Sequence, residues 1–450
     1  MAILTVVGFV ACSSDDPDGG SKSSLKMNRL NLENAQYLTL GESRGSRANL
    51  TETLFKVDAD GNTSVVMLEC VDQEDGSTKN YIYNVEVMPE QFFGLTKSWM
   101  FLLDCKFYCA DNEDIAWKLT NQYNEPAGSY SFNILANKKT GKVYYVPDAQ
   151  ALYFYPNNTV NISDYFAEDK AGNLYTTAEP TMGLSKVSVT PEGAVITKLG
   201  PAGQAFGGKP YIMPNGNIIT IYLDERTRLP YSGDFEVVYP NGGFETYQSD
   251  YTGDSGYITC TNNVIYRVIL PVNEESGKTE LQLQTISVGN TYGSISVSEP
   301  ILRHELNVPL LSWWYAPLYM GENYIIFGSE LAYNKQNGTW IEHEEWPLGN
   351  GFITPTETNV YKNKTYIVWA TGASWMDLNT LEIGAIEFDI PGYLSVDNFQ
   401  SNIPGGECFT CVTDPTDGKS YVYRIDITNG SSTRSEIAYD SSSVTLIPLN

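Results

Sequence analysis

Histidine and basic residues are scarce in this chain of 450 residues. Two histidines and 28 lysines and arginines stand against 54 aspartates and glutamates, which gives a formal net charge of −26. The lysines and arginines form no cluster, so the charge argues against nucleic acid or an anionic membrane surface as a partner. Two histidines, without a second closely spaced cysteine pair, also argue against a zinc site. We therefore expect no metal and no cofactor.

Long apolar segments are also lacking after the first residues. The one continuous apolar stretch runs from Met1 to Ala11, which is shorter than the roughly 20 residues that a transmembrane helix needs. Its length is typical of the apolar core of a secretory signal peptide, and Ala11 is a small residue suited to cleavage. Residues 1–11 are therefore predicted to be a signal peptide.

Cys12 follows this stretch directly, and the sequence then changes at once to serine and aspartate. Residues 9–12 (FVAC) resemble the lipobox of bacterial lipoproteins, and residues 13–16 (SSDD) look like the export signal of Bacteroidota-type surface lipoproteins. The resemblance implies a lipid on Cys12 and a position on the outer face of the outer membrane. The alternative is an ordinary cleaved signal peptide followed by an unmodified cysteine.

Residues 12–50 are predicted to be a lipidated, flexible tether and an N-terminal extension. The stretch from Asp15 to Ser24 is rich in glycine, serine and aspartate, a composition typical of solvated linkers. One short helix is expected between Ser24 and Tyr37. Residues 51–450 are then long enough to form one large β domain.

Helical periodicity is absent from most of the chain, which contains 38 glycines and 22 prolines. Strand-like runs of valine, isoleucine, tyrosine and threonine alternate with glycine-bearing turns, as in residues 58–66 (DADGNTSVV), 213–220 (MPNGNIIT) and 414–425 (DPTDGKSYVYRI). Asn-Gly and Asp-Gly favour the positive φ angles that tight hairpins need. The pattern predicts an all-β protein.

The spacing of these turns indicates the architecture. Gly172 and Gly216 are 44 residues apart, and Gly193 and Gly242 are 49 apart, so two hairpin turns recur in each unit of a propeller blade's length. We predict a β-propeller of seven blades, with six or eight left open. Residues 137–145 (NKKTGKVYY) resemble one repeat of the quinoprotein propellers, which implies the same fold without a quinone. Tandem β-sandwich domains are the alternative.

Two pairs among the seven cysteines are closely spaced: Cys105 with Cys109, and Cys408 with Cys411. In an extended strand the members of these pairs would lie about 13 and 10 Å apart. A disulfide needs Cα atoms within about 7 Å. We therefore expect buried thiols or bridges between strands, and the sequence leaves both open.

Catalytic motifs are not evident. The chain has no nucleophile elbow, P-loop or dinucleotide-binding glycine pattern. Residues 58–69 have the ligand spacing of a calcium loop, but Thr63 stands where such loops carry glycine, so we favour a hairpin turn.

His343, within residues 341–346 (IEHEEW), is a weak sign of a metal or general-base site, and His304 has no distinguishing neighbours. Plentiful acidic residues leave a glycoside hydrolase or lyase open.

Aromatic residues are abundant, with 31 tyrosines and eight tryptophans. Residues 310–320 (LLSWWYAPLYM) and 369–379 (WATGASWMDLN) place aromatic rings beside proline, glycine and serine. Exposed rings stack on sugars and on aromatic ligands, whereas packing between propeller blades is the alternative use. We predict ligand contacts from four of these residues: Trp313, Trp314, Tyr315 and Trp375.

These features together predict an extracellular ligand-binding module anchored to the membrane by a lipid, in preference to an enzyme. The expected ligand is a glycan, a siderophore-like compound or a peptide. The resemblance to surface lipoproteins implies an outer-membrane transporter as a partner that receives the ligand. A structural or adhesive surface protein is the second alternative.

Overall fold

The computed structural model describes strands, turns and short connections from residue 25 to residue 449. The described residues are 25–43, 52–85, 92–108, 132–146, 165–177, 184–191, 193–199, 209–223, 230–248, 256–306, 318–328, 331–342, 347–348, 351–352, 355, 359–369, 371–391, 399–437, 439–440 and 446–449. Within these ranges, no helix combines the length and the apolar character needed to cross a bilayer.

Three four-stranded antiparallel paths follow one another between residues 166 and 297. They consist of β11 (Phe166–Glu168), β12 (Leu174–Thr176), β13 (Ser185–Thr190) and β14 (Gly193–Lys198); β15 (Lys209–Ile212), β16 (Ile218–Leu223), β17 (Pro230–Val238) and β18 (Phe244–Tyr247); and β19 (Gly256–Thr261), β20 (Val264–Ile269), β21 (Glu280–Val288) and β22 (Ile295–Val297). A further strand, β23 (Leu302–Glu305), also pairs with β21.

Three more paths of the same kind continue towards the C-terminus. They consist of β24 (Leu318–Met320), β25 (Tyr324–Phe327), β26 (Leu331–Asn334) and β27 (Trp340–Glu342); β30 (Val360–Tyr361), β31 (Lys364–Trp369), β32 (Gly372–Asp377) and β33 (Ile383–Glu387); and β34 (Phe399–Asn402), β35 (Glu407–Thr413), β36 (Ser420–Asp426) and β37 (Ser432–Ile437). A two-stranded hairpin of β28 (Pro347–Leu348) and β29 (Gly351–Phe352) lies between the first two of these paths in the sequence.

A twelve-stranded sheet contains the remaining strands and two further four-stranded paths. One path consists of β39 (Leu446–Pro448), β2 (Ala35–Ser43), β3 (Glu52–Asp58) and β4 (Thr63–Val65), and the other of β7 (Phe92–Gly94), β8 (Trp99–Tyr108), β9 (Phe132–Asn137) and β10 (Val143–Val146). The other members of the sheet are β1 (Leu25–Leu30), β5 (Met67–Asp72), β6 (Thr78–Val85) and β38 (Tyr439–Asp440).

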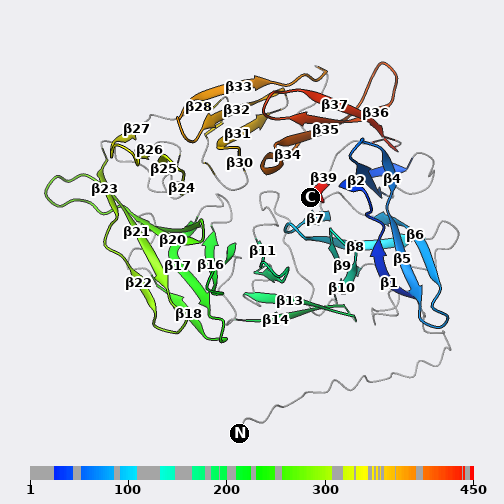
Figure 1. Cartoon of the computed structure of the whole chain (residues 1–450), viewed down its shortest axis with the longest axis horizontal. Coiled ribbons are helices and arrows are strands. Elements are labelled where there is room, and N and C mark those ends of the chain that lie inside the picture. The colour runs from blue at the N-terminus through cyan, green and yellow to red at the C-terminus, as the bar shows by residue number, and fades with distance from the viewer. Residues whose placement is uncertain are drawn as a thin grey trace, which may run out of the picture.

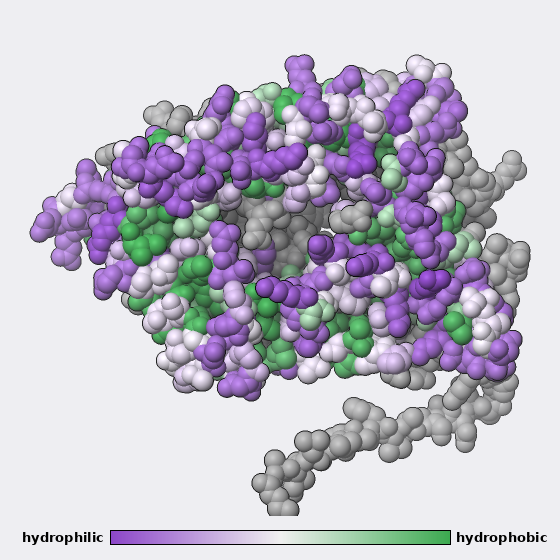
Figure 2. Space-filling model, viewed as in Figure 1, coloured by the Kyte–Doolittle hydropathy of each residue, from purple (hydrophilic) through white to green (hydrophobic). Residues whose placement is uncertain are grey.

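The sheets stand around a common centre, in the order in which they occur in the chain (Figure 1). This arrangement is a β-propeller, and it confirms the predicted fold class over tandem sandwich domains. The described strands supply eight four-stranded paths, one more than the seven preferred from the sequence and one of the counts left open. In the same view, hydrophilic residues dominate the periphery of the ring (Figure 2).

The ring is closed by the last strand of the chain. In the antiparallel register between β39 and β2, Ile447 lies opposite Leu38, and both side chains are buried. The path that contains β2 therefore takes its first strand from the C-terminus and its other three from the N-terminal region. Closure of this kind joins the two ends of the chain within one blade and leaves only short, protected edges.

Residues 25–43 correct two expectations from the sequence. The helix expected between Ser24 and Tyr37 is wrong, because this segment forms β1 and the start of β2. The first blade therefore begins before residue 51, where the propeller was expected to start. The reason is long-range pairing: β1 pairs with β5, about 40 residues away in the sequence, and buries alternate side chains such as Leu25 and Met27.

Most of the glycine turns recognised in the sequence lie at one end of the sheets. They join first to second strands, as in β11–β12 and β15–β16, or third to fourth strands, as in β3–β4 and β17–β18. Gly61, Gly172, Gly216 and Gly242 occupy these four turns with φ between 82° and 85°. In an antiparallel path both kinds of turn fall at the same end, which we call the tight-turn face.

Apolar residues fill the spaces between successive sheets. One such core joins Ile219 and Phe235 of one sheet to Ile258 and Ile265 of the next. Buried cysteines occur within the described sheets at Cys70, Cys260 and Cys408. Burial raises the pKa of Cys70 and of Cys408 to about 12, so both thiols stay protonated and inert near neutral pH.

Shortening Ile447 to alanine should weaken ring closure. The side chain is 3% exposed, and its truncation should lower the free energy of unfolding by about 2–5 kcal/mol. Urea denaturation followed by circular dichroism measures the change. Ile383→Ala in β33 is the matched control, because Ile383 is 37% exposed and its loss should cost under about 1 kcal/mol. Equal losses in the two variants would contradict the role assigned to β39.

Candidate functional site

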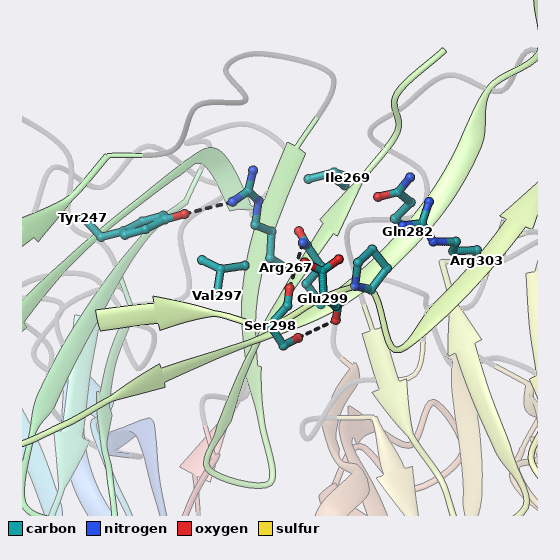
Figure 3. Close-up of a pocket in the computed structure, with 10 residues that line it drawn as sticks. Tyr247, Arg267, Ile269, Gln282, Val297, Ser298, Glu299 and Arg303 are labelled. Carbon is teal, nitrogen blue, oxygen red and sulfur yellow. Dashed lines mark hydrogen bonds between the residues drawn. The ribbon is translucent and has the colours of Figure 1, made fainter. Parts of the chain in front are cut away.

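An open cleft of about 460 Å³ lies beside the sheet formed by β19–β22, on the side of β18 (Figure 3). Its volume is within the range of small-molecule sites. We call it the Arg267 cleft. It is lined by Tyr247, Arg267, Ile269, Gln282, Gln284, Val297, Ser298, Glu299, Pro300 and Arg303.

Side-chain alternation in β20 and β21 makes the floor of this cleft polar. In β21, Leu281 and Leu283 are fully buried against the following sheet, so Gln282 and Gln284 point to the opposite side. Arg267 of β20 lies directly across from Gln284 in the antiparallel register. The polar residues therefore come together on the face of the sheet that carries the cleft.

A break in the fourth strand opens the cleft. Both β22 and β23 pair with β21, and the residues between them leave the regular ladder. The ladder is held on each side of the break by Ser298 N, which donates to Thr285 O at 2.9 Å, and by Ile301 N, which donates to Leu283 O at 2.7 Å. Pro300 has no N–H to pair within this interruption. The break lies beside Gln284, so the strand does not cover that side chain.

Arg267 is the central residue of the cleft. The residue is 4% exposed, and its Nη1 donates a hydrogen bond of 2.9 Å to the Tyr247 hydroxyl. The Tyr247 ring stacks on Phe235 at 4.9 Å between centroids, which fixes the hydroxyl. The guanidinium of one sheet is thus held by a side chain of the preceding sheet.

The Gln284 amide supplies a second polar group. Its Nε2 donates to Ser298 O at 3.0 Å. Its Oε1 is buried, and the described part of the chain offers it no hydrogen-bond donor. Buried acceptors are normally paired, so a ligand hydroxyl or amide that reaches this oxygen would satisfy it.

Charges at the rim are already compensated. Arg303 Nη1 lies 3.2 Å from Glu280 Oε2, and the Gln282 amide donates to the same oxygen. Arg303 is therefore neutralised locally and is half exposed, a setting in which ion pairs contribute little. Arg267 lies deeper in the cleft than Arg303, with Tyr247 as one of its partners.

Sequence reasoning did not single out Arg267. The available signal was an arginine in the middle of an apolar strand, residues 264–270 (VIYRVIL). An arginine in such a strand is buried only when other groups satisfy its donors, and here Tyr247 is one of them. Nothing in the linear sequence connects Tyr247, Gln284 and Glu299 to it.

A second cleft, of about 200 Å³, lies at the seam between the first and last blades, where Tyr37 and Arg424 line it. Arg424 Nε donates to Glu407 Oε1 at 2.8 Å, and the Tyr37 hydroxyl donates to the other oxygen of the same carboxylate. The network joins β2 to β35 and β36. Its charges compensate one another, and we assign it to ring closure.

The residues predicted from the aromatic content are placed as follows. Trp313, Trp314 and Tyr315 lie in residues 307–317, which are outside the described residues. Cys12 also lies outside the described residues. Trp375 lies on β32, partly buried, with Lys364 Nζ 3.3 Å from its ring centroid. It packs in the core between β30–β33 and β34–β37. The described structure does not bring Trp375 to the Arg267 cleft.

Two residues that appeared unrelated in the sequence meet between neighbouring sheets. His304 Nε2 lies 2.6 Å from Glu342 Oε1, and the imidazole stacks on Trp340 at 4.4 Å between centroids. His343 lies outside the described residues. Strand alternation turns His304 away from the Arg267 cleft, because its neighbour Arg303 lines that cleft.

Residues 58–62 form a hairpin turn between β3 and β4, as favoured over the calcium loop. The Asp58 Oδ1 atom accepts the backbone N–H of Asp60 at 2.9 Å and that of Asn62 at 2.8 Å. Its Oδ2 atom accepts from the Asn62 side chain at 3.0 Å. The carboxylate that would lead a calcium loop is thus used to stabilise its own turn.

No protein-family model matches this chain, and no curated protein matches it. Apo AztD from Citrobacter koseri aligns with 94% of this chain and 98% of its own, at 10% identity and a TM-score of 0.38. The periplasmic gluconolactonase PpgL from Pseudomonas aeruginosa aligns with 92% of this chain and 99% of its own, at 9% identity and a TM-score of 0.29. TolB from Acinetobacter baumannii aligns with 91% and 81%, at 7% identity and a TM-score of 0.27. These distantly similar β-propeller proteins include an enzyme, and the likeness defines no function for this chain.

The seam network predicts a loss of stability in alkali. Burial, with the hydrogen bond to Glu407 and its charge, raises the pKa of Tyr37 well above its usual range. The folded state holds this proton more tightly, so the stabilisation is complete below the unfolded pKa of about 10 and is lost as the pH rises above it.

Tyr37→Phe removes this titration, so its free energy of unfolding should fall less between pH 8 and pH 11 than that of the wild type. Urea denaturation at the two pH values measures the difference. Tyr292→Phe, at a side chain 77% exposed, is the control and should keep the wild-type slope. Identical slopes for Tyr37→Phe and the wild type would refute the prediction.

Proposed function

We propose that this chain is an extracellular ligand-binding propeller that takes an anionic, hydroxyl-rich ligand in the Arg267 cleft. The observation that carries the proposal is a buried guanidinium in an open cleft whose floor is polar. Arginine presents a planar fork of donors that matches a carboxylate with two parallel hydrogen bonds. Tyr247 already holds that fork in place, so little side-chain entropy is lost on binding.

Among the expected ligand classes, an acidic glycan matches the cleft best. A sugar carboxylate would pair with Arg267. Sugar hydroxyls would donate to Gln284 Oε1, which is buried without a described donor, and to the Glu299 carboxylate at the cleft lining. The amide of Gln282 and the apolar edge of Ile269 complete a surface suited to a polar ring.

The acidic residues of the cleft favour a binding function over a hydrolytic one. Glycoside hydrolases use two carboxylates, about 5–10 Å apart, on either side of the bond that is cleaved. Among the described residues that line this cleft, Glu299 is the one with a carboxylate. The nearby Glu280 already accepts hydrogen bonds from Arg303 and Gln282.

The predicted aromatic contacts are kept as part of this proposal. Trp313, Trp314 and Tyr315 follow β23 in the sequence, and β23 supplies Arg303 to the cleft. Rings that stack on sugars would add affinity without charge. Trp375 is the fourth proposed contact, and Lys364 and the core pack against it.

We also propose that Cys12 carries a lipid, which would place the propeller on the outer face of the outer membrane. The support is the sequence of residues 9–16. A tethered binding module would concentrate a ligand at the cell surface and pass it to an outer-membrane transporter.

Substituting the proposed anion contact tests the function. Isothermal titration should show saturable binding to one of a panel of uronic-acid oligosaccharides and none to the matched neutral sugars. Arg267→Met should weaken that binding by about tenfold or more, because a hydrogen bond to a charged group contributes about 1.5–3 kcal/mol. Arg303→Met at the compensated rim is the control, with a change of about threefold or less.

Thermal melts of both variants would show whether the fold is retained. Equal binding of acidic and neutral sugars would contradict the role of the guanidinium. Binding that survives Arg267→Met but is lost in Trp313→Ala or Trp314→Ala would move the site to the aromatic residues. A folded wild type that binds no member of the panel would refute an acidic glycan as the ligand.

Replacing Cys12 with serine tests the anchor. The variant should move from the membrane fraction to the soluble fraction, because the lipid that buries in the bilayer is no longer attached. Fractionation followed by immunoblotting measures the change, and Cys70→Ser, at a buried thiol, controls for loss of a cysteine elsewhere. Unchanged membrane association of the Cys12 variant would contradict lipidation at this position.

A further inference from the structure

The Gln284 amide has one defined orientation in the Arg267 cleft. Its Nε2 donates to Ser298 O at 3.0 Å. A carbonyl oxygen accepts hydrogen bonds and donates none, so this contact distinguishes the nitrogen of the amide from its oxygen. The Oε1 atom is therefore an acceptor on the other side of the amide from Ser298.

Ser298, the partner of this amide, is held by hydrogen bonds at the break in the fourth strand. Its backbone N donates to Thr285 O at 2.9 Å, and its Oγ accepts from Thr285 N at 3.0 Å. The same hydroxyl donates to Glu299 O at 2.8 Å (Figure 3). The Gln284 amide is thus fixed before any ligand arrives, and little side-chain entropy is lost when a ligand binds to it.

The Oε1 atom of Gln284 has hydrogen-bonding capacity to spare. The residue is partly exposed and lines the cleft, whereas its Oε1 is buried and has no donor among the residues that the structure describes. An ionised carboxylate has no hydrogen to donate, but a hydroxyl or an N–H does. A site with such an acceptor discriminates against a ligand that leaves the acceptor unpaired.

Gln282 differs from Gln284, although it lies two residues away on the same strand and lines the same cleft. Its amide donates to Glu280 Oε2, the oxygen that Arg303 also contacts. Gln282 therefore belongs to the compensated rim of the cleft. It is the matched control for the role of Gln284.

The position of Gln284 relative to Arg267 limits which part of a ligand reaches it. The two residues lie directly opposite each other in the register of β20 and β21. Side chains at such positions share one face of the sheet, with Cβ atoms about 4.5–5.5 Å apart. This spacing is close to the width of one sugar ring. One sugar unit can therefore place its carboxylate at Arg267 and a hydroxyl at Gln284.

We propose that Gln284 is the specificity-determining residue of the Arg267 cleft, and that it selects an acidic sugar by a ring hydroxyl on the unit that carries the carboxylate. The inference rests on the proposed function and adds what the cleft distinguishes among acidic sugars. Arg267 recognises the charge that all uronic acids share. Gln284 recognises a hydroxyl, so a sugar that lacks it or is substituted there leaves Oε1 unpaired.

Removing the ligand's hydroxyls one at a time tests the inference on the wild-type protein. The probes are methyl glucuronide and methyl galacturonide, each compared with its monodeoxy analogues by NMR titration. One analogue should bind at least about tenfold more weakly than its parent, because the hydrogen bond to the buried acceptor is lost.

Two matched variants assign this effect to a residue. Gln284→Met keeps the approximate length of the side chain and removes the acceptor, so parent and analogue should then bind within about threefold of each other. Gln282→Met should keep the discrimination shown by the wild type. Thermal melts of both variants establish that the fold is retained.

The outcomes separate this inference from the proposed function. Uronide binding that depends on Arg267 but is insensitive to the loss of every hydroxyl would overturn the inference and leave the proposed function standing. Discrimination that persists in Gln284→Met would also overturn it, and so would binding of uronic-acid oligosaccharides without either methyl uronide. A folded wild type that binds no uronic acid at all would instead refute the proposed function, and the inference with it.

Discussion

The pairing of β39 with β2 is the contact on which the rest of the ring depends. It joins the last strand of the chain to a strand near its beginning, and buries Ile447 opposite Leu38. The Tyr37–Glu407–Arg424 network strengthens the same seam with hydrogen bonds and charge. Each inter-sheet core needs two neighbouring sheets, so an open ring would expose apolar faces at both of its ends.

The Arg267 cleft arises where the packing rule of the ring is locally broken. Elsewhere, apolar side chains from adjacent sheets fill the space between them, as in the core around Phe235. Further along the same strands β20 and β21, Arg267, Gln282 and Gln284 replace apolar residues, and the fourth strand is interrupted beside them. Departures from regular packing of this kind commonly mark functional sites.

The few cationic side chains in buried positions have a particular importance in a chain of net charge −26. Arg267 lies buried between sheets and Lys138 lies buried near Gly94 and Ile447, whereas Arg424 at the seam is partly exposed. A surface of strong negative charge repels anionic ligands at long range, but at physiological ionic strength this repulsion falls off over about 8 Å. Recognition of an anion would therefore depend on short-range contact with a buried cation.

The amino-acid sequence by itself determined the all-β class, the hairpin turns and the approximate length of a blade. These follow from local causes, such as the positive φ of Gly61 and Gly216 and the alternation of buried residues in strands. Tertiary structure alone decided that residues 25–30 form a strand, that β39 closes the ring by pairing with β2, and that His304 meets Glu342. The Arg267 cleft belongs to the same group. Each depends on contacts between residues from about 20 to 400 positions apart, and pairing over such distances leaves no local pattern to recognise.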